Sequence, residues 1–347
     1  MLNGGSVPKR VTIDDVARHA GVHKATVSRA LNAHTQVQVN AETAERVRAA
    51  ARELGYVPNF VARGLRLNHS MTVGVIIPDV ANPIFPPIMR GIEECLQPRG
   101  YTALLANTDG QSAVEDAAFH SLLQRRVDGF IVATGRLDDQ PVIAGAFGDG
   151  VPVVMVNRWA GSAPYPVVTA DNERGIRAAV EHLHELGHRR IAHLAGPANF
   201  STTHQRAEAF SAVTASMAGV AASVVEAGAL SAEAGATAMD ELLARQGSSR
   251  PTAVIAANDL VALGAIRSLR AHGLRCPEDV SIVGYNDMPF AADFWPALTT
   301  VRIPLREIGL QGARMLLDAI EAGHQEPATV TLPVTLVVRG STAIASS

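Results

Sequence analysis

From Met71 onward, short β-rich runs alternate with stretches of helical periodicity. Before residue 298 the runs are Val73–Ile77, Ala103–Ala106, Phe130–Ala133, Val153–Val156, Ile191–Leu194, Ala253–Ala257 and Val280–Gly284. Strands that alternate with helices predict parallel sheets covered by helices. Seven or more strands are too many for a single sheet of ordinary size. We therefore predict two doubly wound lobes, with the chain crossing between them near Val168–Asn172.

Further apolar runs after residue 298 are suited to carry the chain back across both lobes, and these are Thr299–Ile303, Thr329–Leu332 and Val334–Val338. We expect lobe 1 to comprise about 71–168 and 299–331. Lobe 2 then comprises about 169–298 and 332–345. Ligands of doubly wound sheets bind at the carboxyl ends of the strands, so the sequence predicts a cleft there.

Residues 1–55 predict a small all-α domain of three helices. Thr12 precedes apolar residues at helical spacing and can form a capping box with Asp15. Gly21 supplies a tight turn into a second short helix. Asn40 can cap a third helix, which Gly55 ends. Three apolar stripes of this kind can close one miniature core.

The second of these helices has two different sides. Its apolar side carries Val27, Ala30 and Leu31, and its polar side carries Lys24, Ala25, Ser28 and Arg29. Residues 1–70 hold a formal charge of +5, against −8 for the rest of the chain. A helix, a glycine turn and a second helix with a basic face predict a helix-turn-helix that enters the DNA major groove. A small helical interaction module is the alternative, which the charge disfavours.

Residues 56–70 are too polar for a core element and too short for a domain, so we interpret them as a linker. Asn59 can cap one or two helical turns over roughly Phe60 to Leu67. So short a helix is marginal in water and needs a partner to become ordered.

Cysteine content and leader signals bear on location. Cys95 and Cys276 form neither a CxxC motif nor a disulfide framework, which favours a reducing compartment. The sequence shows no secretory leader and no apolar stretch of about 18 residues, so we expect a cytoplasmic protein that does not enter the membrane.

Residues 11–32, VTIDDVARHAGVHKATVSRALN, resemble the DNA-binding domain of the LacI/GalR family of bacterial transcriptional regulators. Residues 55–67, GYVPNFVARGLRL, are similar to the hinge helix of that family. The segments IIPDVANPIF, HLHELGHRRIAHLAGP, AANDLVALGAI and VGYNDMPFAADFWPALTTVRIP resemble its regulatory core. The resemblance implies a dimer that reads a near-palindromic operator. It also implies a periplasmic-binding-protein-like core whose small effector sets the DNA affinity.

The resemblance assigns DNA contacts by position. Lys24, Ala25 and Arg29 would face base edges, and Arg29 suits a bidentate contact to guanine. Phosphate contacts are implied for Thr12, Thr26, Ser28 and Asn32. Leu65 matches the hinge leucine that wedges into the minor groove, with packing of the linker as its alternative role. The chain departs from the family at His23, where the family usually has Ser.

Polar residues directly after strands are the candidates for the cleft. They are Asp79, Asn82 and Phe85, then Asn157 and Arg158, then Asn258 with Asp259, and Asn286 with Asp287. Arg206 matches a ligand-binding arginine of the family. Hydrogen-bonding pairs with one aromatic face suit a sugar-like effector, and Arg158 with Arg206 also suits an anionic group. Each single residue has an alternative role as a helix cap or in a salt bridge, especially Asp259 and Asp287.

Catalysis and metal binding lack support in the sequence. His182, His184 and His188 cluster, but they lie at a predicted helix end before a strand. Phosphate-loop, HExxH and GxSxG motifs are missing from the sequence, so we expect no enzyme, no cofactor and no metal. The alternative function is a cytoplasmic sugar-binding or sugar-processing protein with an incidental helical domain. Only nine residues follow Val338, so we expect a homodimer without a helical tetramerisation segment.

Overall fold

The structure is a computed structural model that describes residues 11–31, 38–56, 69–138, 140–161, 165–246 and 250–345. The chain divides into two compact units, residues 1–70 and 71–347. In the described residues, no helix combines the length and the apolar character needed to cross a membrane.

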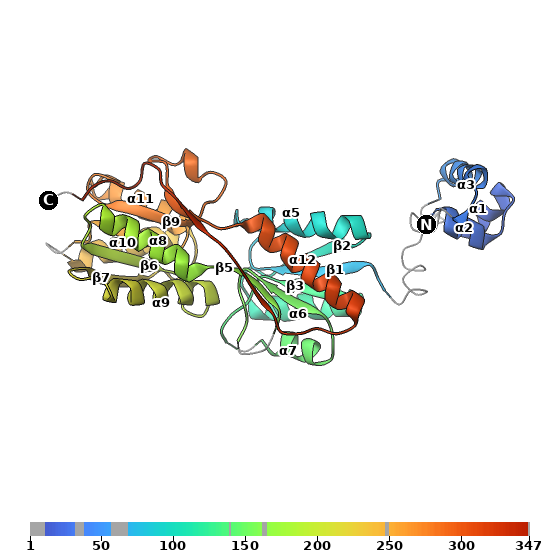
Figure 1. Cartoon of the computed structure of the whole chain (residues 1–347), viewed down its shortest axis with the longest axis horizontal. Coiled ribbons are helices and arrows are strands. Elements are labelled where there is room, and N and C mark those ends of the chain that lie inside the picture. The colour runs from blue at the N-terminus through green and yellow to red at the C-terminus, as the bar shows by residue number, and fades with distance from the viewer. Residues whose placement is uncertain are drawn as a thin grey trace, which may run out of the picture. The chain divides into compact units, whose positions relative to one another are not determined.

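In its described residues the first unit holds three helices, α1 (Ile13–Ala20), α2 (Lys24–Ala30) and α3 (Ala41–Glu53), coloured blue in Figure 1. Their apolar faces meet in one small core that includes Val16, Val27 and Val47, as predicted. The predicted capping box is present, since the Asp15 backbone N–H donates to the Thr12 hydroxyl and the Thr12 N–H donates to the Asp15 carboxylate. The Asn40 side chain caps α3 as expected.

Lobe 1 of the second unit is a six-stranded sheet in the order β11-β5-β4-β3-β1-β2. All its strand pairs are parallel. The strands are β1 (Thr72–Ile77), β2 (Thr102–Asn107), β3 (Gly129–Val132), β4 (Val153–Val156), β5 (Val167–Ala170) and β11 (Thr329–Leu332). Helices α5 (Phe85–Leu96) and α12 (Leu305–Ala322) lie together on one face, and α6 (Ser112–Gln124) and α7 (Pro141–Gly148) lie on the other (Figure 1).

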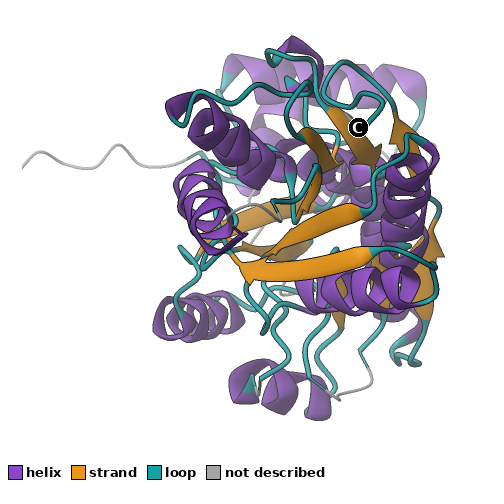
Figure 2. Ribbon diagram, turned by 90° about the vertical axis from the view of Figure 1, so that its left-hand side faces the viewer, coloured by secondary structure: helices purple, strands orange, loops and turns teal. Residues whose placement is uncertain are grey.

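Lobe 2 has the same architecture, with the strand order β12-β10-β9-β8-β6-β7. Its strands are β6 (Arg190–Ala195), β7 (Ala221–Glu226), β8 (Ala253–Ala256), β9 (Ser281–Asn286), β10 (Thr299–Arg302) and β12 (Thr335–Val337), of which only β12 is antiparallel to its neighbour. Helices α8 (Asn172–Glu185) and α9 (Ser201–Ala215) cover one face, and α10 (Ala232–Gln246) and α11 (Asp259–Ala271) cover the other. Figure 2 looks onto this lobe and shows its strands, in orange, between the helices that cover them, in purple.

The predicted two-lobed fold is confirmed, but one assignment within it is wrong. Residues 299–302 were expected in lobe 1, whereas β10 pairs in parallel with β9 and belongs to lobe 2. The chain therefore changes lobes after β10 and not before it. The other two crossings follow β5, which ends at Ala170, and β11.

The apolar core is continuous across these crossings. Val168 of β5 and Tyr285 of β9 belong to the same buried cluster, although they lie in different lobes. The two lobes are therefore packed against each other, and their strand ends face a shared region.

Candidate functional site

Helix α2 presents the polar face that the sequence predicts. Lys24 and Arg29 are exposed, whereas Val27 and Ala30 are buried against the other helices. Ala25, Thr26 and Ser28 are partly exposed and complete this face. A short helix with two exposed cations and small neighbours matches the shape and charge of the major groove.

The start of α2 is fixed by His23. The Ala25 backbone N–H donates to His23 Nδ1 at 3.2 Å, so the imidazole replaces the hydroxyl that the family usually places there. Lys24 Nζ lies 3.9 Å from the Asp14 carboxylate. A hollow of about 360 Å³ opens here between Ile13, Asp14, His23, Lys24 and Ala25. The N-terminus of the candidate recognition helix therefore adjoins an accessible hollow.

Thr12 lies at the corresponding start of α1. Its hydroxyl donates to the Asp15 carboxylate at 2.6 Å, and this hydrogen bond, with the one from the Thr12 backbone, lowers the pKa of Asp15. The predicted DNA contacts Asn32, Asn59 and Leu65 lie outside the described residues. Their roles stay predictions.

The two lobes touch where the predicted cleft residues gather. The Leu137 backbone N–H of lobe 1 donates to the Asn199 carbonyl of lobe 2 at 2.8 Å. The Trp159 N–H donates to the Ser201 hydroxyl at 3.0 Å. The loop after β4 thus contacts the first turn of α9, directly beside Asn157 and Arg158.

Arg206 is 3% exposed and is held entirely by lobe 2. Its Nε donates to Asn172 Oδ1 at 2.9 Å, and one terminal nitrogen donates to the Ala257 carbonyl at 2.6 Å. Its guanidinium carbon lies 3.7 Å from the centroid of the Tyr285 ring. Burial lowers the pKa of Arg206, although Tyr285 and Asp259 favour its charged form.

Arg158 approaches the same region from lobe 1. It is 4% exposed, and its guanidinium carbon lies 3.9 Å from the centroid of the Phe200 ring in lobe 2. Its Nε is buried and has no hydrogen-bond partner. Burial, and secondly the positive charge of Arg206, lower the pKa of Arg158 to about 10. The structure therefore brings together the two arginines that the sequence singled out.

Asn157 and Asn286, which end β4 and β9, have left-handed backbone conformations, with φ of 64° and 112°. Asn adopts positive φ more readily than most residues. Both side chains are nearly buried, with residue exposures of 4% and 6%. These two residues keep their predicted places at the strand ends.

Other predicted cleft residues have structural roles. Asn258 caps α11 by accepting from the Val261 N–H at 2.8 Å. The Asp287 carboxylate pairs with Arg302 at 2.6 Å and Arg339 at 2.7 Å. In the loop after β1, Asp79 and Asn82 each accept a backbone N–H two residues ahead. Asn258 is thus a helix cap and Asp287 an ion-pair partner, while Asp79 and Asn82 form turns, and the ligand contacts predicted for these residues stay predictions.

Phe85 lies deeper in the fold than a ring that faces a ligand needs to be. We predicted that its ring would offer an aromatic face to a ligand; it is 1% exposed and packs in the core at the start of α5, and its contact with a ligand stays a prediction. The aromatic side chains of this region that contact the two arginines are instead Phe200 and Tyr285. The predicted histidine cluster is also structural, since His188 contacts the hydroxyls of Thr252 and Ser281.

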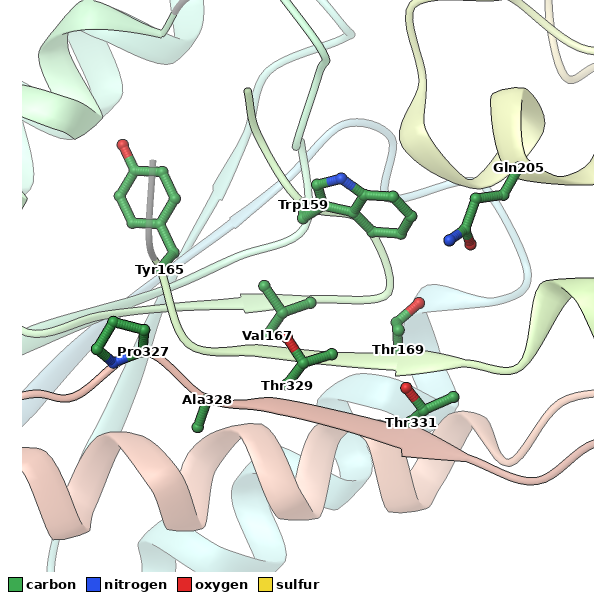
Figure 3. Close-up of a pocket in the computed structure, with 9 residues that line it drawn as sticks. All are labelled: Trp159, Tyr165, Val167, Thr169, Gln205, Pro327, Ala328, Thr329 and Thr331. Carbon is green, nitrogen blue, oxygen red and sulfur yellow. The ribbon is translucent and has the colours of Figure 1, made fainter. Parts of the chain in front are cut away.

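A pocket of about 390 Å³ is lined in part by Trp159 and Gln205, the residues next to the two arginines in sequence, and the sequence did not predict it. Figure 3 shows one face of β5 and β11 as its floor, with Trp159 and Gln205 facing each other above Thr169 and Thr331. Trp159 follows Arg158, and Gln205 precedes Arg206 and accepts a hydrogen bond from Asn172 at 3.0 Å. The pocket and Arg206 are thus joined through hydrogen bonds of Asn172.

Comparison with known proteins gives matches in both units. Residues 12–59 match the family model "Bacterial regulatory proteins, lacI family", and residues 180–342 match the model "Periplasmic binding protein-like domain". The HTH-type transcriptional repressor CytR of Escherichia coli K12 is 35% identical over 332 residues, which cover 95% of this chain and 96% of CytR. The ribose operon repressor of Halalkalibacterium halodurans is 35% identical over 333 residues, covering 95% of this chain and 97% of the relative.

Solved structures agree with these matches. The Lac repressor dimer bound to operator and the anti-inducer ONPF has a TM-score of 0.83 and 33% identity, covering 96% of this chain and all of that one. A LacI family regulator from Enterococcus faecium with bound ribose has a TM-score of 0.70 and 31% identity, covering 79% of this chain and all of that one. With its three-helix unit, its two lobes and relatives that match almost end to end, the chain belongs to the lacI family of bacterial regulatory proteins.

Proposed function

We propose that this chain is a transcriptional repressor that binds operator DNA as a homodimer and whose DNA affinity is set by a small sugar-like effector. The observation that carries the proposal is the presence of two different sites in one chain. One is the exposed basic face of α2, and the other is the interlobe region around Arg158 and Arg206. A DNA-binding surface joined to a ligand-binding core is what a ligand-controlled regulator requires.

On the DNA side, residues 1–55 form the DNA-binding domain and 56–70 the linker with the hinge helix. Lys24, Ala25 and Arg29 contact bases, while Thr12, Thr26, Ser28 and Asn32 contact phosphates. Asn59 starts the hinge helix, and Leu65 enters the minor groove at the centre of the operator. The Lac repressor structure bound to operator supports this arrangement.

On the effector side, the ligand lies between the lobes at the carboxyl ends of the strands. Arg206 holds it from lobe 2, and Asn157, Arg158 and Asn286 complete its surroundings. The ribose-bound family member supports a sugar-like ligand, and a carbohydrate-utilisation operon is the matching target. Closure of the lobes around the ligand changes the geometry in which the two DNA-binding domains of the dimer are presented.

An enzymatic role receives less support from the same region. Asp259, a carboxylate that acts on Arg206, accepts hydrogen bonds from the Thr300 hydroxyl and the Met288 N–H, so it is engaged in the fold. We therefore propose binding without catalysis. Because a repressor acts on the chromosome, the proposal also places the protein in the cytoplasm.

The test begins with genomic fragments selected for binding to the full-length protein. The selected operator is then titrated by electrophoretic mobility shift with wild type, Arg29→Ala and the control Arg314→Ala, whose arginine is exposed on α12 in lobe 1. We expect Arg29→Ala to weaken specific binding by about tenfold or more, as for loss of a bidentate base contact, and the control to match wild type. Equal affinity of wild type for selected and scrambled duplexes would contradict the proposal.

A screen of sugars against the protein–operator complex tests the second half. We expect one sugar or sugar derivative to change the operator affinity. If no member of a broad carbohydrate panel changes it, the chain is not the sugar-responsive repressor proposed here.

A further inference from the structure

The Arg158 guanidinium is buried without a negative partner. Its Nε has no hydrogen-bond partner, and among the described residues none of the ion pairs includes Arg158. A buried cation is costly unless it is paired. The ring of Phe200 offsets part of this cost, because a guanidinium stacked on an aromatic face is attracted to it. An aromatic ring does not neutralise the charge.

A second buried cation lies close enough to increase this cost. Arg206 acts electrostatically on Arg158, and both guanidinium groups are nearly inaccessible to water. Two like charges in a poorly solvated region repel each other strongly. Among the described residues, no carboxylate forms an ion pair with either arginine, so the pair carries an excess of positive charge.

The nearby carboxylates are already engaged. Asp259 acts electrostatically on Arg206 and accepts hydrogen bonds from the Thr300 hydroxyl and the Met288 N–H, and burial raises the pKa of its carboxyl to about 7, so its negative charge is disfavoured. In lobe 1, the Glu115 carboxylate is used by Arg136, Thr134 and Gln140. Neither carboxylate forms an ion pair with Arg158.

The first turn of α9 adds positive potential at the same place. This helix of 15 residues begins after Phe200 without a hydrogen bond from a capping side chain. The Trp159 N–H donates to Ser201 in that turn, so the loop that carries Arg158 is held against the helix end. Backbone N–H groups and the helix dipole at such an end favour an anion.

We propose that the effector carries an oxyanion, a carboxylate or a phosphate, that binds between Arg158 and Arg206 at the N-terminal end of α9. The proposal rests on the proposed role of the interlobe region as the effector site, and it narrows the effector from a neutral sugar to an acidic or phosphorylated one. The planar guanidinium of Arg158 suits paired hydrogen bonds to such a group.

A purely structural role of Arg158 leads to a different expected result. If Arg158 only joins the lobes through Phe200, then replacing it changes stability without changing the response to anions. Thermal unfolding of the full-length protein in sodium phosphate, sodium acetate and sodium chloride at one ionic strength separates the two roles. The variants are Arg158→Gln, Arg158→Lys, and Arg314→Gln as a control with an exposed arginine.

We expect the midpoint of unfolding of wild type and of Arg314→Gln to rise with phosphate or acetate relative to chloride. Arg158→Gln is expected to lose most of this rise, and Arg158→Lys to keep part of it, because lysine retains charge but not the paired geometry. Equal midpoints of wild type in all three salts, or an unchanged rise in Arg158→Gln, would overturn the proposal.

Matched sugar pairs then identify the anion. Calorimetry compares ribose with ribose 5-phosphate, and glucose with glucuronate, on the same protein. Tighter binding of a charged member by about tenfold or more, lost in Arg158→Gln, assigns phosphate or carboxylate. A neutral sugar that binds as tightly as its charged counterpart contradicts the inference.

Operator titration of the same preparations separates the two proposals. If the protein binds its operator but does not respond to oxyanions, the proposed function stands and the anionic effector is refuted. If the protein binds oxyanions but shows no specific DNA binding, the proposed repressor function is refuted and the proposed anion site stands.

Discussion

The Arg206 guanidinium lies over the Tyr285 ring, and that ring occupies space that only a glycine at position 175 leaves open. A Cβ on Gly175 would lie 2.2 Å from the Tyr285 hydroxyl oxygen. Tyr285 is fully buried, so it has no free direction in which to move. Helix α8 therefore sets the position of the tyrosine, and the tyrosine supports the arginine.

Replacing Gly175 with alanine should strain this contact. We expect Gly175→Ala to lower the free energy of unfolding by about 1–3 kcal/mol, as for other overpacked cores. Urea unfolding followed by circular dichroism measures the change. Gly145→Ala in α7 is the control, because a Cβ there meets nothing within 4 Å, and it should be neutral or slightly stabilising. Equal effects at both positions would show that Tyr285 yields without cost.

Arg206→Ala should remove the effector response while operator affinity in the absence of effector stays nearly unchanged. A hydrogen bond from a buried charged donor typically contributes about 1.5–3 kcal/mol to binding, which is about tenfold or more in affinity. Calorimetry with the effector from the sugar screen, beside an operator titration, makes the comparison. Unchanged effector affinity in Arg206→Ala would reject this arginine as a ligand residue.

Asp259 should make stability depend on pH. Burial raises the pKa of this carboxyl in the folded protein to about 7, against an ordinary value of 3.8. Between these values the folded protein holds a proton that the unfolded chain has released. The stabilisation of the folded protein by this bound proton is therefore complete below about pH 4 and is lost as the pH rises towards 7.

Asp259→Asn cannot titrate, so its free energy of unfolding relative to wild type should increase between pH 4 and pH 7. The increase is at most about 4 kcal/mol for a pKa difference of roughly 3. Urea unfolding at a series of pH values measures this increase. The control is Asp318→Asn, which replaces an exposed carboxylate of α12. If the difference in free energy of unfolding between variant and wild type stays constant from pH 4 to pH 7, Asp259 is already ionised in the folded protein at pH 4.

Leu65→Ala should weaken specific operator binding more than non-specific binding. Lys and Arg contacts with phosphate supply non-specific affinity, whereas loss of the apolar insertion leaves the DNA bend uncompensated at a cost of a few kcal/mol. Titration of wild type and variant against operator and scrambled duplex at one salt concentration compares the two. Fluorescence transfer between the duplex ends reports the bend. An equal loss on both duplexes, or an unchanged bend, would assign Leu65 to linker packing alone.

Local features of the fold were predictable because they depend on neighbouring residues. Thr12 and Asp15 are three positions apart, and Asn40 directly precedes the helix it caps, so spacing alone identifies them. The alternation of strands and helices likewise fixes the type of sheet. The lobe that receives β10 depends on pairing with β9, which apolar composition does not specify.

The candidate site was predictable only in part, for a related reason. Arg158 was singled out because it directly follows a strand, and Arg206 because it matches a ligand-binding arginine of the family. The core packing of Phe85 was not predicted, because an apolar ring after a strand suits a core as well as a ligand, and only packing distinguishes them. Phe200 and Asn172 were missed since their roles arise from contacts with distant residues, and no local spacing signals them.

The three crossings between the lobes determine when this protein can finish folding during synthesis. The three-helix unit closes its own core from residues near the start of the chain. Lobe 1 instead lacks its edge strand β11, and lobe 2 its edge strand β12, until residues 329–337 have left the ribosome. The Ser341 hydroxyl then donates to the Ile282 carbonyl of β9. A chain released early therefore carries a finished DNA-binding head on two incomplete lobes, so premature termination yields a head that the effector cannot control.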